Sequence, residues 1–277
     1  EFARKAKIIQ VDIDKNELNK IKKINSLKLN LEAKNFLSLL INKKIAYKKF
    51  DVSKWVKYSK NLLKKFPHVE SKTHKDKNGF INTYNFINKF SDHLTGDECI
   101  VTDMGVGLLS GHQVMKLQKK QRMMTSTGLG EMGYGLPAAI GASFAAGKGE
   151  IICFHSDGGM MMNLQELQTI DHYKLPIKTF VFNNDGYLMI KHTQKNLFGG
   201  KYTAVNKDTD VSCPDFKKVA AAFNMKYFYI KTWQEFNKKI PKILKQKIPM
   251  IIEVMMDPEQ YYHPKLSTGK NNQNIIL

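Results

Sequence analysis

Arginine, cysteine and long apolar runs are scarce in this chain of 277 residues. Its three cysteines, Cys99, Cys153 and Cys213, form no CxxC pair, which argues against a disulfide framework or a zinc site and favours a reducing compartment. No run of about 18 apolar residues is present, so the sequence predicts no membrane-spanning helix. The opening EFARKAKIIQVDID has too short an apolar region for a secretory signal. We therefore expect a cytoplasmic protein with no membrane partner.

The basic residues are almost all lysines. The formal net charge is +19 at pH 7, yet arginine occurs only at positions 4 and 122. Bidentate recognition of bases and phosphates favours arginine, and the lysines here are spread along the whole chain. We expect a solvated, lysine-rich surface whose field attracts small anions, and no nucleic-acid partner.

Two polar turns follow two apolar runs in the middle of the chain. The run at 151–155 ends in Ser-Asp-Gly-Gly at 156–159, and the run at 177–182 ends in Asn-Asn-Asp-Gly at 183–186. Between them, residues 163–174 have the apolar spacing of an amphipathic helix, which Pro176 ends. A strand, helix and parallel strand form one crossover, so both turns should emerge at the carboxyl edge of one sheet.

This arrangement makes Asp157 and Asn184 neighbours. Mg²⁺ prefers hard oxygen ligands in an octahedron and takes a few from protein, with phosphates and water supplying the others. The carbonyl of Gly186 would complete the protein's share, and the N–H groups of Gly158 and Gly159 would face diphosphate oxygens. The alternative is an ordinary helix cap at Asp157 and an ordinary Asn-rich turn, because these residue types are common in both places.

An Asp-Gly pair followed about 25 residues later by Asn-Asn resembles the fingerprint of thiamin diphosphate enzymes, and the segments MNLQEL and YKLPIK resemble their acetolactate synthase branch. The resemblance implies the thiamin diphosphate-binding fold, an α/β three-layer sandwich with a mainly parallel sheet. It implies thiamin diphosphate and Mg²⁺ as cofactors, with Asp157 and Asn184 as side-chain metal ligands and Gly186 as the carbonyl ligand. It leaves open whether FAD is bound.

Three further segments carry the resemblance. LGEMGYGLPAAIGAS resembles the family's loop and helix that hold the aminopyrimidine ring. That match makes Met132 the apolar wedge that bends the cofactor, and the Gly130 carbonyl the acceptor for its amino group. The turn at 103–107 stands where the family contacts the diphosphate, here through the Gly105 backbone. Met189 matches a position that faces the active site, next to Tyr187 and Leu188.

Two residues depart from the family's pattern. Ser156 stands where the fingerprint usually opens with glycine, and Thr193 stands where acetolactate synthases commonly carry a tryptophan associated with the choice of acceptor. The resemblance therefore implies a decarboxylase or carboligase acting on a 2-oxo acid, with donor and acceptor left open. His192 is interpreted either as a residue that steers substrate or as a structural or solvated histidine.

A dinucleotide-dependent oxidoreductase is a competing hypothesis. Residues 128–133 spell GxGxxG, and such a loop needs an acid about 20 residues further on to hold the ribose. Glu150 has roughly that spacing. Glu150 precedes the run at 151–155, however, so it should lie at the amino end of that strand, whereas the ribose would bind at the carboxyl end. The sequence therefore favours a thiamin diphosphate site over a dinucleotide site.

The domain organisation follows from the resemblance. Residues 1–30, with a strand at 6–13 that has no preceding partner, are interpreted as the remnant of a central Rossmann-like domain. Residues 31–79 are interpreted as a helical connector and linker, and 80–277 as the cofactor-binding domain. The family's catalytic glutamate lies on a pyrimidine-binding domain that no segment here resembles, so no catalytic residue is assigned.

The missing pyrimidine-binding domain implies a partner. We expect it from an earlier part of the chain or from a second subunit, within a homodimer or tetramer, and we expect this chain alone to be inactive. A noncatalytic or split-subunit cofactor-binding module is the remaining alternative.

The connector contains two predicted helices, at 33–42 and 52–66. Trp55 and Leu62-Leu63 are expected to face inward from the second helix. His68 and His74 lie in the polar segment at 68–79 without a partner pair at ligand spacing, so we expect both to be solvated. The tail after Pro264 is expected to be loose.

Overall fold

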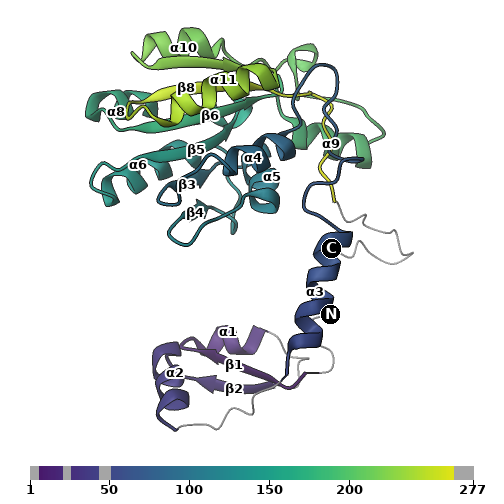
Figure 1. Ribbon diagram of the computed structural model, residues 1–277, viewed down its shortest axis with the longest axis vertical. Coiled ribbons are helices and arrows are strands. Elements are labelled where there is room, and N and C mark those ends of the chain that lie inside the picture. The colour runs from purple at the N-terminus through teal and green to yellow at the C-terminus, as the bar shows by residue number, and fades with distance from the viewer. Residues whose placement is uncertain (1–5, 21–25, 44–50, 265–277) are drawn as a thin grey trace. The chain divides into compact units, whose positions relative to one another are not determined.

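The computed structural model describes residues 6–20, 26–43 and 51–264. The chain divides into two compact units, Glu1–Leu62 and Leu63–Leu277 (Figure 1). The tail for which we expected a loose conformation lies outside the described residues. Within the part of the chain that the structure describes, no helix is both long and apolar enough to cross a lipid bilayer.

The first unit contains a small parallel sheet. Strand β1 (Ile8–Asp12) pairs along its whole length with β2 (Ser26–Asn30); α1 (Lys15–Lys20) lies between them in the chain, and α2 (Ala33–Asn42) follows. The expectation of a lone strand is therefore wrong. We did not predict β2, although the alternation of SLKLN is typical of a half-buried strand; the segment is only five residues long.

Helix α3 (Ser53–Lys65) begins and ends within one residue of the prediction. None of its side chains is buried, and Trp55 is 67% exposed. The prediction that Trp55 and Leu62-Leu63 face inward is therefore wrong. The spacing of apolar residues predicted the helix correctly, but the side chains on its apolar face, including Trp55, are not buried by any described residue.

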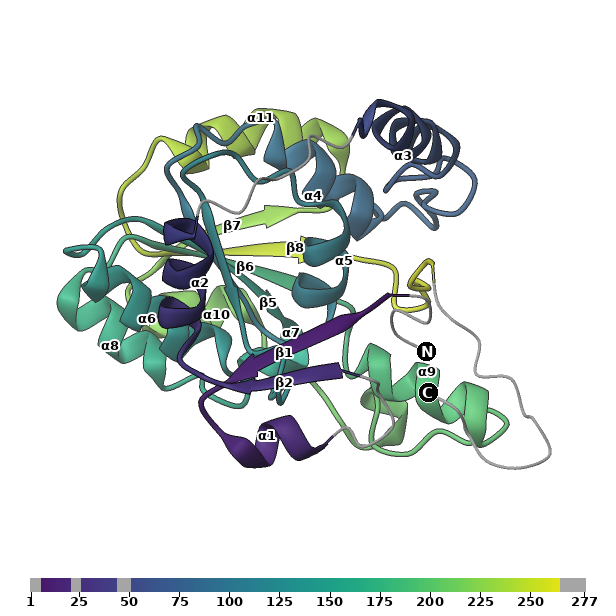
Figure 2. The same cartoon turned by 90° about the horizontal axis from the view of Figure 1, so that it is seen from below.

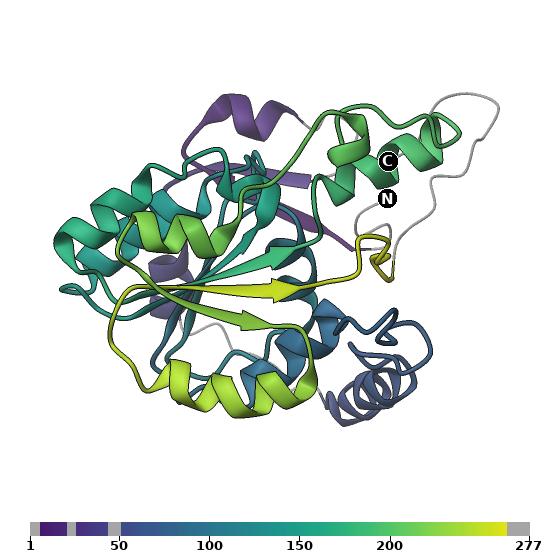
Figure 3. The same cartoon turned by 90° about the horizontal axis from the view of Figure 1, so that it is seen from above.

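The second unit is built on a six-stranded sheet, with every strand pair in the described residues parallel. In Figure 3 the arrows of the green and yellow strands point the same way. Buried strands carry continuous apolar runs because helices cover both faces of such a sheet. The order across the sheet is β4 (Arg122–Thr125), β3 (Cys99–Thr102), β5 (Ile151–Ser156), β6 (Ile177–Asn183), β8 (Met250–Met255) and β7 (Lys226–Ile230).

Helices form a layer on each face of this sheet (Figure 2). One face is covered by α4 (Thr83–Ser91), α5 (Val106–Val114) and α11 (Trp233–Leu244). The other is covered by α6 (Gly135–Ala145), α8 (Glu166–Tyr173) and α10 (Phe216–Ala222). The predicted three-layer α/β sandwich with a mainly parallel sheet is confirmed. The short α7 (Asp157–Met160), α9 (Leu188–Leu197) and the 3₁₀ turn η1 (Lys207–Thr209) lie in the connections.

Aromatic rings fill the core between α4 and the sheet. Phe86 is fully buried and packs edge-on against Phe182 and Phe236, at centroid distances of 5.6 and 5.0 Å. Phe90 packs in the same way against Phe154 and Phe180. These contacts hold β5 and β6 in place under the turns that follow them.

The segment at 68–79, expected to be a linker, is part of the second unit and packs against α4. The His74 side chain is 2% exposed and stacks on the ring of Tyr84 at 4.3 Å. Its Nδ1 accepts a hydrogen bond from the Glu70 N–H at 2.9 Å. The prediction of a solvated His74 is therefore wrong, because Tyr84 on α4 offers a ring that the sequence pattern did not reveal. His68 is exposed, as predicted.

Helix α5 was not predicted beyond the turn expected at 103–107. A Cβ on Gly107 would lie 2.8 Å from the Phe154 Cβ, so the missing side chain lets α5 pack directly on β5. Strand β4 was also missed, since RMMT is short and has no continuous apolar run. Helix α9 was missed as well; apart from Leu188 and His192 its side chains are not buried.

We expect Phe86→Ala to lower the free energy of unfolding by about 3–5 kcal/mol, because it leaves a cavity among buried rings. Phe144→Ala is the matched control, since Phe144 is 42% exposed and should cost much less. Urea denaturation of the two variants measures the difference. Equal losses would contradict this account of the core.

Candidate functional site

A cavity of about 340 Å³ lies at the carboxyl edge of the sheet, where the turns after β3, β5 and β6 meet the loop before α6. Its walls are mostly apolar side chains and glycine backbone. Every residue predicted to contact the cofactor or the metal lines it, except Asp157, which lies directly beneath. The lining residues are Met104, Gly105, Val106, Gly130, Met132, Ser156, Gly158, Gly159, Asn184, Gly186, Tyr187, Leu188, Met189, Ile190, Thr193 and Tyr262.

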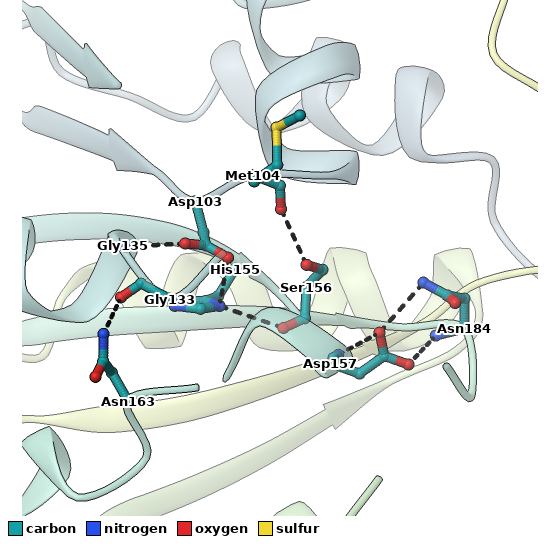
Figure 4. A network of polar contacts seen from close by, with 10 residues as sticks. Asp103, Met104, Gly133, Gly135, His155, Ser156, Asp157, Asn163 and Asn184 are labelled. Carbon is teal, nitrogen blue, oxygen red and sulfur yellow. Dashed lines mark hydrogen bonds and ion pairs between the residues drawn. The ribbon is translucent and has the colours of Figure 1, made fainter. Parts of the chain in front are cut away.

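The carboxylate of Asp157 joins the two polar turns (Figure 4). Its Oδ2 accepts hydrogen bonds from the backbone N–H of Asn184 at 2.9 Å and of Gly186 at 3.0 Å. Its Oδ1 accepts from the Asn184 side-chain amide at 3.3 Å and from the Gly158 N–H at 2.8 Å. The predicted convergence of Asp157, Asn184 and Gly186 is confirmed. The Gly158 N–H, which we expected to face a ligand, instead donates to this carboxylate.

Burial dominates the electrostatics of Asp157. The side chain is fully buried, and burial raises the pKa of its carboxyl to about 6, although hydrogen bonds from Gly186, Gly158 and Asn184 act in the opposite direction. A nearby cation would favour the ionised form and reverse this shift. The carboxylate is thus placed where a positive charge stabilises it most.

The surrounding oxygens fit a small hard cation. Ligands on adjacent corners of a Mg²⁺ octahedron lie about 3 Å apart. A half turn of the Asn184 amide about its Cβ–Cγ bond would place Oδ1 where Nδ2 lies, 3.3 Å from Asp157 Oδ1. The Gly186 carbonyl oxygen is also close, 3.5 Å from where a Cβ on Gly158 would lie, and Gly186 lines the cavity.

No group of three or more His, Cys, Asp or Glu side chains in the described ranges could hold a metal. A metal at this cavity would therefore depend on the mixed set of carboxylate, amide and carbonyl oxygens.

Three glycines create the room for this arrangement. A Cβ on Gly158 would lie 2.3 Å from the Tyr187 ring, and one on Gly159 would lie 2.1 Å from Asp103 Oδ2. Gly186 has φ +142°, and a Cβ there would lie 2.1 Å from the Val205 carbonyl oxygen. Side chains at Gly158 and Gly159 would displace Tyr187 and Asp103, so packing requires glycine there, and at Gly186 the positive φ favours glycine as well.

A second buried carboxylate, Asp103, ties other walls of the cavity together (Figure 4). Its Oδ1 accepts from the Gly135 N–H at 3.0 Å, at the start of α6, and its Oδ2 lies 3.3 Å from His155 Nδ1. Nδ1 also lies 3.2 Å from the Ser156 carbonyl oxygen; both neighbours are acceptors, so Nδ1 carries the proton. Burial raises the pKa of Asp103 and lowers that of His155.

The loop before α6 is fixed from a further side. The Asn163 side-chain amide donates to the Gly133 carbonyl at 2.9 Å, so the turn after β5 holds the loop that contains Gly130 and Met132. The roles of Asp103 and Asn163 were not predicted from the sequence. Asp103 did have a signal, because it follows the run CIVT as directly as Asp157 follows CFHS.

His192 and Glu150 lie away from the cavity walls. The His192 ring is buried on α9 between Tyr261, stacked at 4.7 Å, and Tyr262, at 5.4 Å, which indicates a structural residue. Glu150 lies at the amino end of β5 and forms an ion pair with the buried Lys178 at 2.7 Å. It cannot reach a ligand at the carboxyl edge, which argues against the dinucleotide hypothesis.

Residues 103–254 match the family described as thiamine pyrophosphate enzyme, C-terminal TPP binding domain. The chain belongs to this family. The matched region contains every predicted cofactor residue, from Gly105 to Met189. Membership agrees with the geometry, in which the two halves of the thiamin diphosphate fingerprint meet at Asp157 and Asn184.

Among members of the thiamine pyrophosphate family, acetolactate synthases are similar to this chain. The large subunit from Porphyra purpurea is 31% identical over 279 residues, covering 100% of this chain and 46% of that protein. The isozyme 1 large subunit from Escherichia coli (strain K12) is 30% identical over 278 residues, covering 100% and 47%. The chain is acetolactate synthase-like and spans about half the length of these relatives.

A solved structure supports the fold. The thiamine diphosphate-dependent 4-hydroxybenzoylformate decarboxylase from Rhodococcus jostii RHA1 superposes with a TM-score of 0.71. The match covers 92% of this chain and 45% of that one, at 19% sequence identity. At 19% sequence identity, this similarity shows that the two proteins share a fold and shows nothing further.

We expect Gly159→Ala to destabilise the protein by about 1–3 kcal/mol or more, because its Cβ would overlap the buried Asp103 carboxylate. Gly141→Ala on α6 is the control: its Cβ would meet nothing within 4 Å, and alanine in a helix is about 0.5–1 kcal/mol more favourable than glycine. Denaturant unfolding compares the two. A Gly159→Ala protein as stable as the unsubstituted one would contradict the packing described for this turn.

Proposed function

We propose that the protein containing this chain binds thiamin diphosphate with Mg²⁺ in the cavity and acts on a 2-oxo acid as a decarboxylase or carboligase. The observation that carries the proposal is the Asp157 carboxylate, which holds both fingerprint turns beside a cavity of suitable size. Family membership and similarity to acetolactate synthases support it.

The chain's own residues would bind and orient the cofactor. Asp157, Asn184 and the Gly186 carbonyl would hold Mg²⁺ and, through it, the diphosphate, with Gly159 allowing close backbone approach. Gly130 and Met132 lie on the opposite loop, where they would contact the aminopyrimidine ring. When bound, thiamin diphosphate supplies a C2 carbanion and an electron sink for loss of CO₂ from a 2-oxo acid.

The substrate end of the cavity is formed by α9 and the segment after β8. Met189, Ile190 and Thr193 line it from α9, and Tyr262 lines it from the other side. The apolar side chains would exclude water from the reacting carbon. Thr193 stands where acetolactate synthases commonly carry a tryptophan associated with the choice of acceptor. We therefore infer a 2-oxo acid substrate without assigning acetolactate synthesis.

The proposed reaction needs a pyrimidine-binding domain, and we infer that it covers the mouth of the cavity. Large apolar side chains are exposed directly beside lining residues: Leu129 is 88% exposed next to Gly130, and Ile190 on the cavity wall is 42% exposed. Coverage of about half the length of the relatives supports a domain supplied by another part of the protein or by a second subunit. We propose a cytoplasmic homo-oligomer, a dimer or tetramer, as the active form.

We expect the complete protein to bind thiamin diphosphate only with Mg²⁺ present, and Asp157→Ala to weaken this binding at least 100-fold because the metal loses its charged ligand. Isothermal titration calorimetry measures both. Asp97→Ala is the control, since Asp97 is exposed and forms a surface ion pair with Lys120. Undiminished binding by Asp157→Ala would refute the metal assignment.

We expect this chain alone to release no CO₂ from pyruvate or larger 2-oxo acids, and the complete protein, or the chain mixed with its pyrimidine-binding domain, to release it. Coupled CO₂ assays test this, with size-exclusion chromatography to follow assembly. Assembly and cofactor binding without CO₂ release from any 2-oxo acid would favour the noncatalytic module instead.

A further inference from the structure

Ser156 makes a contact that no glycine can make. It is the last residue of β5, its side chain is 8% exposed, and it lines the cavity. Its hydroxyl donates a hydrogen bond to the Met104 carbonyl at 3.0 Å, in the turn after β3 (Figure 4). Ser156 and Met104 therefore connect two walls of the cavity.

This hydrogen bond continues the pairing between β3 and β5 beyond the end of the strands. The ladder pairs Thr102 with Phe154, and the Asp103 N–H then donates to the Phe154 carbonyl at 2.8 Å. After these residues the two segments separate, one entering α5 and the other α7. The hydroxyl of Ser156 supplies the next cross-link, so the two turns stay in register where the backbone ladder has stopped.

The turn held in this way has an unusual backbone. Gly105, directly after Met104, has φ +101° and ψ −137°, and its carbonyl accepts the Leu109 N–H at 3.0 Å to begin α5. A Cβ on Gly105 would lie 3.0 Å from Ser156 Oγ. Glycine has many conformations open to it, so a neighbouring contact is needed to select this one. The Met104 carbonyl bond to Ser156 provides that contact.

We propose that Ser156 is a positioning residue that fixes the Met104-Gly105 turn against the turn at Asp157, so that both turns facing the cofactor's diphosphate are in place before it binds. The proposal rests on the proposed function. The resembled fingerprint usually has glycine at this position, which has no side chain to form such a hydrogen bond. Because Ser156 holds the Met104-Gly105 turn on folding, the turn does not have to become ordered when the cofactor binds.

The test uses the complete protein, with Ser156→Ala and Ser156→Gly as variants. A neutral hydrogen bond of this kind contributes enough to expect about 3- to 10-fold weaker thiamin diphosphate binding at fixed Mg²⁺. Ser143→Ala is the matched control, because the Ser143 hydroxyl also donates to a carbonyl, that of Gly149 at 2.9 Å, far along α6 from the cavity. Its affinity for thiamin diphosphate should be unchanged.

Hydrogen exchange of the ligand-free proteins separates positioning from general destabilisation. In Ser156→Ala and Ser156→Gly, the amides of residues 106–109 should exchange several-fold faster, while those of β6 and β8 exchange as before. Saturating thiamin diphosphate and Mg²⁺ should restore their protection. A loss of structure throughout the domain would speed exchange in the central strands as well.

Two results would overturn the proposal alone: Ser156→Ala binding thiamin diphosphate as tightly as the unsubstituted protein, or unchanged exchange at residues 106–109 in both variants. An equal loss of affinity in Ser143→Ala would also overturn it. If the unsubstituted protein fails to bind thiamin diphosphate with Mg²⁺, the proposed function fails and this proposal fails with it.

Discussion

The buried carboxylate of Asp157 is the constraint on which the site depends. Asp157 directly follows β5, yet the hydrogen bonds to its carboxylate come mainly from the turn after β6, so two segments far apart in the chain share one charged group. An ionised carboxylate is costly to bury unless donors or a cation surround it. The backbone of Asn184 and Gly186 supplies donors, and the proposed Mg²⁺ would stabilise the charge further. The same group therefore shapes the fold locally and defines the chemistry it can support.

The cavity exists because side chains are missing around it. Gly158, Gly159 and Gly186 each occupy a position where a Cβ would overlap a neighbouring atom: the Tyr187 ring, the Asp103 carboxylate and the Val205 carbonyl oxygen. Asp103 then connects β3, β5 and the start of α6 through Gly135 and His155. Polar groups buried in this way must find partners inside the protein, which makes the walls of the site mutually dependent. Backbone atoms consequently face the space that a diphosphate would fill.

Three of the failed predictions concern contacts between segments that are separate in the chain. His74 was expected to be solvated, but it lies against Tyr84, a contact between residues whose proximity no local pattern reveals. The strand at β1 was expected to be alone, because its short partner β2 was not predicted. Helix α5 was not predicted beyond the turn at 103–107, and its Gly107, of a type that reduces helix propensity, here serves close packing on β5. In each case a tertiary contact outweighed the local preference.

The sequence by itself determined the two strands that precede Asp157 and Asn184, the helix between them and the edge of the sheet at which the two residues meet. Apolar runs, turn residues and crossover handedness act through neighbouring residues and through general rules of chain geometry, so a single sequence suffices to read them. Only the tertiary structure decided which donors reach the Asp157 carboxylate, that Asp103 pairs with His155, and that Ser156 holds Met104. Those contacts join separate strands across a few ångströms, and their distances depend on how the sheet and its helices pack, which no local pattern encodes.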